Sequence, residues 1–166
     1  MTTTPSFTLC ELSRLSGAIT ATSSAVNGTI AHIDLGAQGR QYAGAPGATD
    51  NSAPAAFGRF TVVVDVGAID VSSLNESYVI ELQGSATSDF AVAYRLGSLT
   101  LGHSSTTGNA TSTPPNCRRS FLCDNRYYPD STAGNVSACA RFVRLRIVPS
   151  GTTPSLVVGG AWLLPL

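Results

Sequence analysis

The feature that most constrains the fold of this chain is an apolar residue at every second position, repeated in several separate segments. In segment 60–66 the even positions are all apolar, while Thr61 and Asp65 mark the other face. Segments 78–83 and 141–148 repeat the pattern, the latter with arginines on the outward face. Because successive side chains of a β-strand point to opposite sides, this period predicts half-buried strands.

Further segments complete a strand-only reading. Segment 90–96 alternates in the same way, and segment 155–163 reads as a last strand that is buried on both faces, with Trp162 in the core. A short strand is expected at 32–36, and Leu99 and Leu101 close another. No strong window has the helical period. Six to eight short strands therefore predict an all-β, antiparallel sandwich or barrel.

The remaining segments predict how the chain is organised. Residues 1–30 are polar and irregular, and we expect an extended N-terminal arm that could add a strand to a neighbour's sheet edge. Residues 31–166 form the sandwich domain, with a Gly- and Ala-rich loop at 36–58. Residues 102–136 are rich in Ser, Thr, Pro, Asn and Gly, and we expect one long loop insertion there.

The charge balance excludes some partners. Charged residues make up 12% of the chain, the formal net charge is zero, and every basic residue outside histidine is an arginine. No strong field would draw the chain to nucleic acid or to an anionic membrane, so neither is expected as a partner. A net charge near zero promotes association. The first residues lack the basic start and apolar run of a secretory signal, so we expect synthesis in a cytoplasm.

The search for catalytic groups finds no recognisable apparatus. The chain has two histidines, His32 at the start of a strand and His103 in a polar loop, and it has no nucleophile elbow. The acidic candidates read as solvated outward positions or turn caps; they are Asp65, Asp70, Glu76 and Glu81. We therefore expect no enzymatic activity, no cofactor and no metal.

The four cysteines leave three alternatives open. They are Cys10, Cys117, Cys123 and Cys139, and none forms a C-x-x-C pair. A disulfide between Cys117 and Cys123 would close and order a small loop. Synthesis in a reducing cytoplasm favours free thiols instead. A zinc site that combines cysteines with His103 is the least favoured alternative.

One part of the expected loop insertion carries the strongest binding signal. Arginine and aromatic residues crowd into eleven positions: Arg118, Arg119, Phe121, Arg126, Tyr127 and Tyr128. Arginine and tyrosine are enriched at protein-interface hot spots, which favours a protein interface. Stacking on single-stranded nucleic acid is an alternative, although Asp124 and Asp130 dilute the charge. A loop that packs back on its own domain is a second alternative.

Several strand motifs together resemble a known family. They are Ile33-Asp34-Leu35-Gly36, Phe60 to Val66, Tyr78 to Ser85, Ser88-Asp89-Phe90, Arg141-Phe142-Val143-Arg144-Leu145 and Ala161-Trp162-Leu163. In this order they resemble small capsid cement proteins of tailed phages, over roughly residues 30–101 and 139–164. The first 30 residues and segment 102–136 depart from the family pattern.

The resemblance implies a fold and a role. It implies a jelly-roll-like antiparallel β-sandwich on the outer surface of the virion's capsid, where it would cement neighbouring major capsid subunits. The implied partners are the major capsid protein and the chain itself, as a homo-dimer or homo-trimer.

A second reading belongs to a different class of function. A carbohydrate- or receptor-binding β-sandwich of a phage tail or fibre could stack sugar rings on Tyr127, Tyr128 or Trp162. A small hydrolase on a β-sandwich is a third reading, but it lacks a nucleophile and base that the sequence can name.

Overall fold

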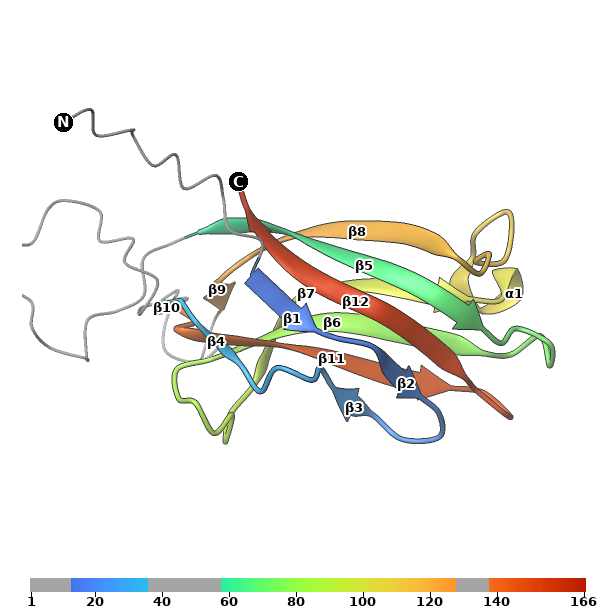
Figure 1. Cartoon of the computed structure of the whole chain (residues 1–166), viewed down its shortest axis with the longest axis horizontal. Helices are drawn as coiled ribbons and strands as arrows, with labels where there is room; N and C mark the ends of the chain where they lie inside the picture. Colours follow the sequence, from blue (N-terminus) through green and yellow to red (C-terminus); the bar gives the residue numbers. More distant parts are fainter. Residues whose placement is uncertain (1–12, 36–57, 128–137) are drawn as a thin grey trace, which may run out of the picture.

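Two antiparallel β-sheets packed face to face make up the chain in the computed structural model, which describes residues 13–35, 58–127 and 138–166 (Figure 1). The only helix in these ranges is α1 (Ser104–Thr107). The prediction of an all-β sandwich is confirmed.

The sheets are named here after their central strands. The β5 sheet has the order β1-β12-β5-β8, with β2 also paired to β12. Its strands are β1 (Ser13–Ser16), β2 (Ile19–Ala21), β5 (Arg59–Ile69), β8 (Cys117–Asp124) and β12 (Leu156–Pro165). The β6 sheet has the order β3-β11-β6-β7, with β4 also paired to β11. Its strands are β3 (Val26–Asn27), β4 (Ile33–Asp34), β6 (Ser77–Ser85), β7 (Tyr94–Gly102) and β11 (Phe142–Ser150). A separate two-stranded ladder joins β9 (Arg126–Tyr127) to β10 (Ala138–Cys139).

The strand order is that of a jelly roll. β1 and β2 act as one interrupted strand along β12, and β3 and β4 act as another along β11. Counting each pair once and leaving out the β9–β10 ladder, the strands of the β5 sheet are first, eighth, third and sixth in the chain, and those of the β6 sheet are second, seventh, fourth and fifth. This alternation between two sheets wraps the chain around one core, as in jelly rolls.

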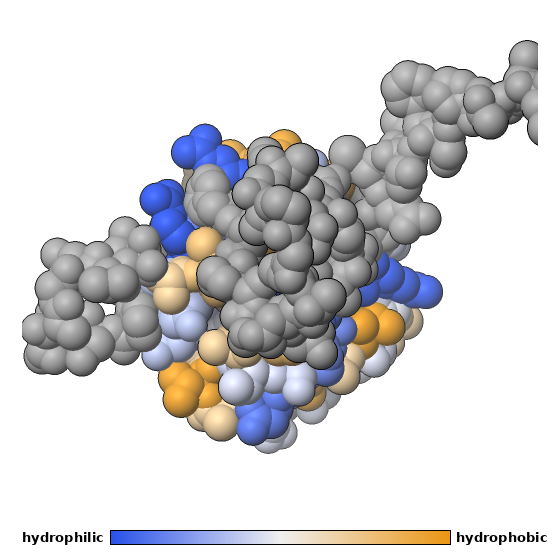
Figure 2. All heavy atoms as spheres, turned by 90° about the vertical axis from the view of Figure 1, so that its left-hand side faces the viewer, coloured by the Kyte–Doolittle hydropathy of each residue, from blue (hydrophilic) through white to orange (hydrophobic). Residues whose placement is uncertain are grey.

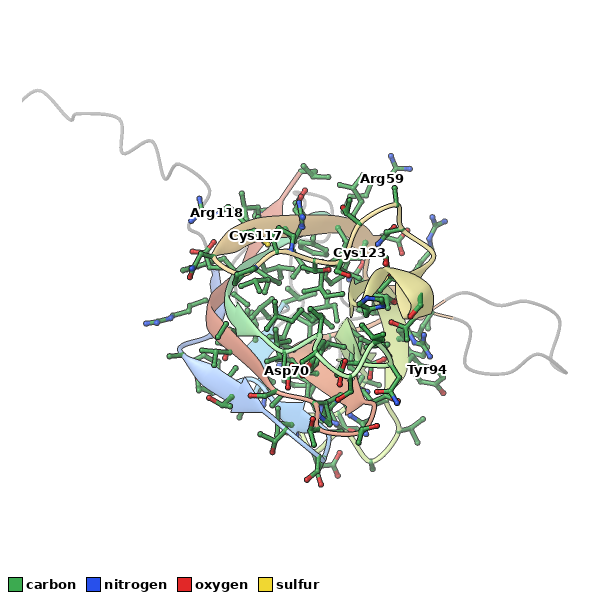
Figure 3. All side chains as sticks on the ribbon, turned by 90° about the vertical axis from the view of Figure 1, so that its right-hand side faces the viewer. Arg59, Asp70, Tyr94, Cys117, Arg118 and Cys123 are labelled. Atoms are coloured by element: carbon green, nitrogen blue, oxygen red, sulfur yellow. The ribbon has the colours of Figure 1, made fainter. Side chains whose placement is uncertain are left out.

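The core follows from the predicted alternation. In β5, Val62 and Val64 are 0% exposed, whereas Val63 between them is half-buried on the outer face. In β11, Val143, Leu145 and Ile147 are buried, as predicted. Side chains of both sheets fill the space between them (Figure 3). Burial of apolar side chains on one face of each sheet is therefore what holds the two layers together.

Residues 13–30 do not form the extended arm that we expected. β1, β2 and β3 pair with long strands of the two sheets, and Leu15 and Ala21 are buried in the core. These strands have two to four residues, so they are too short to show a period. Residues 1–12 lie outside the described part of the chain.

The expected loop insertion at 102–136 contains an integral strand. β8 pairs with β5 along its whole length, from Val66 opposite Cys117 to Arg59 opposite Asp124. Its inward positions include the cysteines and Arg119, and its outward positions include Leu122. This mixed composition hides the alternation, because an edge strand needs to bury only part of one face.

Two further strand predictions were wrong in detail. Segment 90–93 is not extended, and β7 begins only at Tyr94, so that Val92 is 58% exposed. In β12, the register shifts between Val158 and Gly160. This bulge reverses the phase, so Leu163 enters the core and Trp162 lies on the outer face, half-buried.

Candidate interaction surfaces

The structure does not bring the six predicted interface residues together. Within β8, Arg118 points outward, while Arg119 and Phe121 lie on the inward side of the sheet edge. Arg126 and Tyr127 belong to β9, and Tyr128 lies outside the described residues. Because successive strand residues face opposite ways, a cluster in sequence becomes three separate environments in space.

Arg118 is already engaged within its own sheet. Its Nε lies 2.6 Å from Asp65 Oδ1 and its Nη2 lies 2.9 Å from Asp65 Oδ2, so it donates a bidentate pair of hydrogen bonds. These bonds hold the pKa of Asp65 below its ordinary value. The pair is exposed at the periphery of the sandwich, where Figure 3 labels Arg118. A surface pair of this kind contributes little to stability.

Phe121 and Tyr127 pack on their own domain. Phe121 lies against the core cluster, and Tyr127 is 9% exposed. The Tyr127 ring stacks on that of Tyr94, with 4.2 Å between centroids and 23° between planes. Burial raises the pKa of Tyr127. For these two aromatic residues the structure favours the alternative of a segment that packs back on its own domain.

The outer face of the β5 sheet carries apolar side chains that the sequence did not single out. Cross-strand pairing places Trp162 beside Val63, and Leu164 next to Thr61, which in turn pairs with Leu122. We call Val63, Leu122, Trp162 and Leu164 the outer apolar row. Leu122 is 71% exposed and the other three are half-buried. Adjacent apolar side chains on an open sheet face are a feature of binding surfaces.

Arginines border this outer apolar row. Arg14 of β1 pairs with Trp162 in the ladder, and Arg59 stands at the start of β5 on the same face. Neither forms an ion pair with an acid among the described residues, although Arg14 Nε donates to the Ser16 carbonyl at 3.2 Å. In the end-on view of Figure 2, hydrophobic and strongly hydrophilic side chains lie next to each other around the visible rim. A partner with an apolar patch and carboxylates would complement this face.

The outer face of the β6 sheet is closed by its own polar side chains. Glu81 is 6% exposed, and its carboxylate lies 3.3 Å from Arg95 Nε and accepts a 2.9 Å hydrogen bond from Gln83 Nε2. Arg144 Nε donates to Gln83 Oε1 at 3.0 Å, and the Arg144 guanidinium lies 4.2 Å from the Phe90 ring centroid. Burial lowers the pKa of Arg144. These side chains form hydrogen bonds and ion pairs with one another, so this face offers a partner few unsatisfied polar groups.

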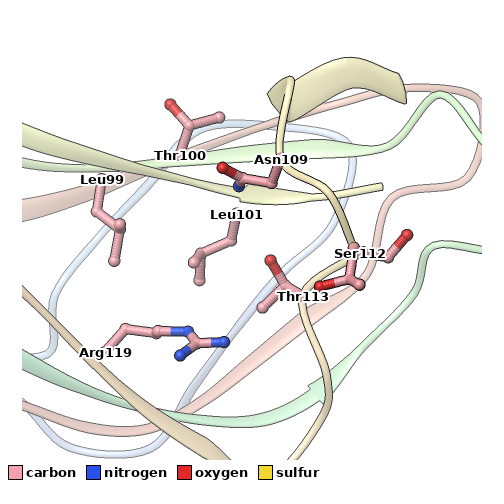
Figure 4. Close-up of a pocket in the computed structure, with 8 residues that line it drawn as sticks. Leu99, Thr100, Leu101, Asn109, Ser112, Thr113 and Arg119 are labelled. Carbon is pink, nitrogen blue, oxygen red and sulfur yellow. The ribbon is translucent and has the colours of Figure 1, made fainter. Parts of the chain in front are cut away.

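A pocket of about 260 Å³ lies between the edge strands of the two sheets (Figure 4). It is lined by Leu99, Thr100, Leu101, Asn109, Thr111, Ser112, Thr113 and Arg119. Strand β7 supplies the first three, the segment after α1 supplies the next four, and β8 supplies the arginine. The pocket thus contains one cation, several hydroxyls and an apolar wall.

The titratable residues considered for catalysis have structural surroundings. His32 packs edge-on against Phe142, with 5.1 Å between centroids, and His103 caps α1 by accepting a hydrogen bond from the Ser105 amide at its Nδ1. The Asp70 side chain caps a turn at Ser72, whose amide lowers the pKa of Asp70. Among the described residues, no three His, Cys, Asp or Glu side chains gather as a metal site requires.

Glu76 is the one described residue with a buried side-chain oxygen that lacks a partner. Its side chain is fully buried, and Oε1 accepts a 3.1 Å hydrogen bond from the Ser73 amide, whereas Oε2 has no partner. The Glu76 carbonyl also accepts bonds from the His103 amide and the Thr106 hydroxyl. The residue therefore anchors the turn before β6 to the start of α1.

The structure contradicts the proposed disulfide. Cys117 and Cys123, both labelled in Figure 3, are free and lie near opposite ends of β8 (Cys117–Asp124). Six residues of extended strand separate their Cα atoms by about 20 Å, whereas a disulfide requires less than about 7 Å. Cys139 is also free, and Cys10 lies outside the described residues.

Comparison with known proteins adds no relative. No family model matches the chain, and no significant match was found among curated proteins or solved structures. No helix in the described ranges is long and apolar enough to cross a membrane.

Proposed function

We propose that this chain is a non-enzymatic structural virion protein that binds the outer surface of a phage head and cements neighbouring major capsid subunits. Two observations support the proposal: the strand motifs resemble those of capsid cement proteins, and the strand order is the jelly roll that viral capsid domains also use. A fold by itself does not define a function, so the proposal has to rest on a surface.

The observation that carries the proposal is the contrast between the two sheet faces. The β6 sheet covers itself with a hydrogen-bonded network around Glu81. The β5 sheet instead exposes the outer apolar row beside Arg14 and Arg59. An apolar centre with an arginine rim is the usual composition of a protein interface.

The symmetry of a capsid would strengthen binding through a small surface such as the outer apolar row. Each copy needs only a weak contact if identical contacts repeat around the shell and copies associate with each other, as a homo-dimer or homo-trimer, because linked sites gain from a high effective concentration. The low net charge of the chain removes the repulsion that would oppose such crowding.

Replacement of Leu122 by Ser tests whether the outer apolar row binds the capsid. Because Leu122 is 71% exposed in the isolated chain, Leu122→Ser should change the free energy of unfolding by less than about 0.5 kcal/mol. If the side chain is buried on the capsid, its loss should weaken decoration about tenfold or more. The measurement is occupancy of phage heads that lack the protein, titrated with wild type and variant.

Val92→Ser is the matched control, because Val92 is an aliphatic residue of similar exposure, 58%, that lies outside the β5 sheet. It should decorate like wild type. Equal decoration by the Leu122 variant would remove the β5 sheet face from the interface. Wild-type protein that fails to bind any head would remove the capsid role altogether.

Carbohydrate binding is the second candidate, and the pocket at the sheet edge is the observation that favours it. Jelly rolls also include lectin domains, and the pocket offers hydroxyls, an amide and a guanidinium to a polar ligand. None of the lining residues in the described ranges is aromatic, however, so these residues offer no ring on which a sugar could stack. A glycan-binding screen of the purified chain distinguishes this function from capsid decoration.

A further inference from the structure

The pocket lies where the edge strands of the two sheets move apart. β7 and β8 are the outermost strands of their sheets on the same side. They touch where a Cβ on Gly97 would lie 2.7 Å from Cys123 Cβ and 3.3 Å from the Leu122 carbonyl oxygen. Further along, the strands diverge, and the pocket opens between Leu99 and Leu101 on one side and Arg119 on the other (Figure 4).

The segment after α1 forms a third side of the pocket, next to β7 and β8, and hydrogen bonds hold it in place. Thr113 exchanges two bonds with Gly102: its amide donates to the Gly102 carbonyl at 2.9 Å, and its Oγ1 accepts from the Gly102 amide at 3.1 Å. Ser112 Oγ accepts from the Ser104 amide at 3.0 Å. Because both hydroxyls act as acceptors in these bonds, each retains a hydrogen to donate to a ligand.

The electrostatic balance of the pocket favours an anion. Arg119 is the only charged residue among the described residues that line the pocket, and it forms no hydrogen bond or ion pair with any of the described residues. By contrast, its neighbour Arg118 donates two hydrogen bonds to Asp65. This exposed guanidinium lies close to hydroxyl donors, and the described lining residues offer it no carboxylate, so an anion could replace the water around it.

The residues that line the pocket favour a carboxylate as the bound anion. A single guanidinium matches the planar, bidentate geometry of a carboxylate. The apolar wall of Leu99 and Leu101 suits the methylene groups of an acidic side chain. β8 is also an edge strand with only β5 beside it in the sheet, so an extended peptide could lie along it close to Arg119.

We propose that this pocket, here called the Arg119 pocket, binds the carboxylate of an acidic side chain in an extended peptide segment. The guanidinium of Arg119 donates two hydrogen bonds to the carboxylate, the hydroxyls of Ser112 and Thr113 can donate further bonds, and the half-buried Leu99 contacts the side-chain stem. The site is separate from the outer apolar row, and it is independent of any role on a capsid.

The test is a titration of the full chain followed by NMR. The probe is a capped five-residue peptide with a central glutamate between β-branched residues. Its glutamine counterpart, free glutarate and free glucuronate serve as comparison ligands. The readouts are the shifts of the Arg119 side-chain Nε–H group and of the backbone amides of residues 109–113. The glutamate peptide should shift both sets in a saturable way and bind more tightly than glutarate, and its glutamine counterpart should not.

Variants of Arg119 test whether the peptide binds in the Arg119 pocket. Arg119→Gln should weaken binding of the glutamate peptide about tenfold or more, because a hydrogen-bonded charge pair is lost. Arg119→Lys keeps the charge but loses the planar fork, so its affinity should be intermediate. Arg118→Gln removes the neighbouring exposed arginine, which points to the other face of the same strand and is paired with Asp65, and it should bind within about twofold of wild type.

Three results would overturn the proposal. The first is absence of saturable shifts up to about 10 mM peptide, which is weaker than a useful contact. The second is unchanged affinity in Arg119→Gln, given a wild-type-like spectrum for the rest of β5 and β8. The third is tighter binding of glucuronate than of the peptide, which would assign the pocket to acidic sugars. None of these results depends on whether the Leu122 variant decorates a head.

Discussion

Val64→Asp should unfold the chain or cost about 4 kcal/mol or more, whereas Val63→Asp should cost only about 1 kcal/mol. The two residues are identical neighbours in the middle of β5, but Val64 is 0% exposed in the core and Val63 lies half-buried on the outer face. A carboxylate at position 64 would be buried between the two sheets, beside Ala161 and Arg119 in the ladder, whereas at position 63 it reaches water. Urea denaturation of both variants gives the measurement.

The corresponding threonine variants keep the comparison measurable if Val64→Asp does not fold. Threonine has nearly the shape of valine, so Val64→Thr isolates the cost of burying a hydroxyl, about 1–3 kcal/mol. Val63→Thr should stay within about 0.5 kcal/mol of wild type. Equal losses at the two positions would mean that β5 does not have one buried and one open face, and the sandwich description would be wrong.

Stability should fall as the pH rises above 9, and Cys123 should cause much of the loss. Burial raises the pKa of the Cys123 thiol from its ordinary 9.0 to about 12. Below pH 9 neither the folded nor the unfolded chain ionises this group, so it adds no pH dependence. Between pH 9 and about 12 the unfolded chain loses the proton while the folded chain retains it. Deprotonation then favours the unfolded state, and stability decreases with pH.

The expected size is about 1–2 kcal/mol between pH 9 and pH 11, since the thiol is only partly shielded from water. The measurement is urea denaturation at both pH values with a reductant present. Cys123→Ala should be less stable at pH 8 because it loses packing, but its stability should decline less with pH. A small decline should remain, because burial also raises the pKa values of Tyr78 and Tyr127. An undiminished decline in Cys123→Ala would assign the effect to other groups.

The interaction surfaces could be predicted only in part. The sequence predicted that Arg118 and Arg119 belong to one interface, but it could not show that one is bound to Asp65 and that the other lines a pocket. That difference depends on the pairing of β8 with β5, which joins residues more than 50 positions apart. Trp162 was placed in the core because its neighbours are apolar, and the bulge near Gly160 turned it outward.

The sequence by itself determined that this protein is an all-β, antiparallel fold and which side chains of β5, β6 and β11 fill the core. Those properties follow from a local period of two, because each strand carries the alternation of its own faces. Only the tertiary structure decided that residues 13–30 and 117–124 belong to the sheets, that the strands follow a jelly-roll order, and that apolar side chains lie on the outer face of the β5 sheet. Edge strands and bulges leave little trace in a sequence, because their positions are set by pairing with distant strands.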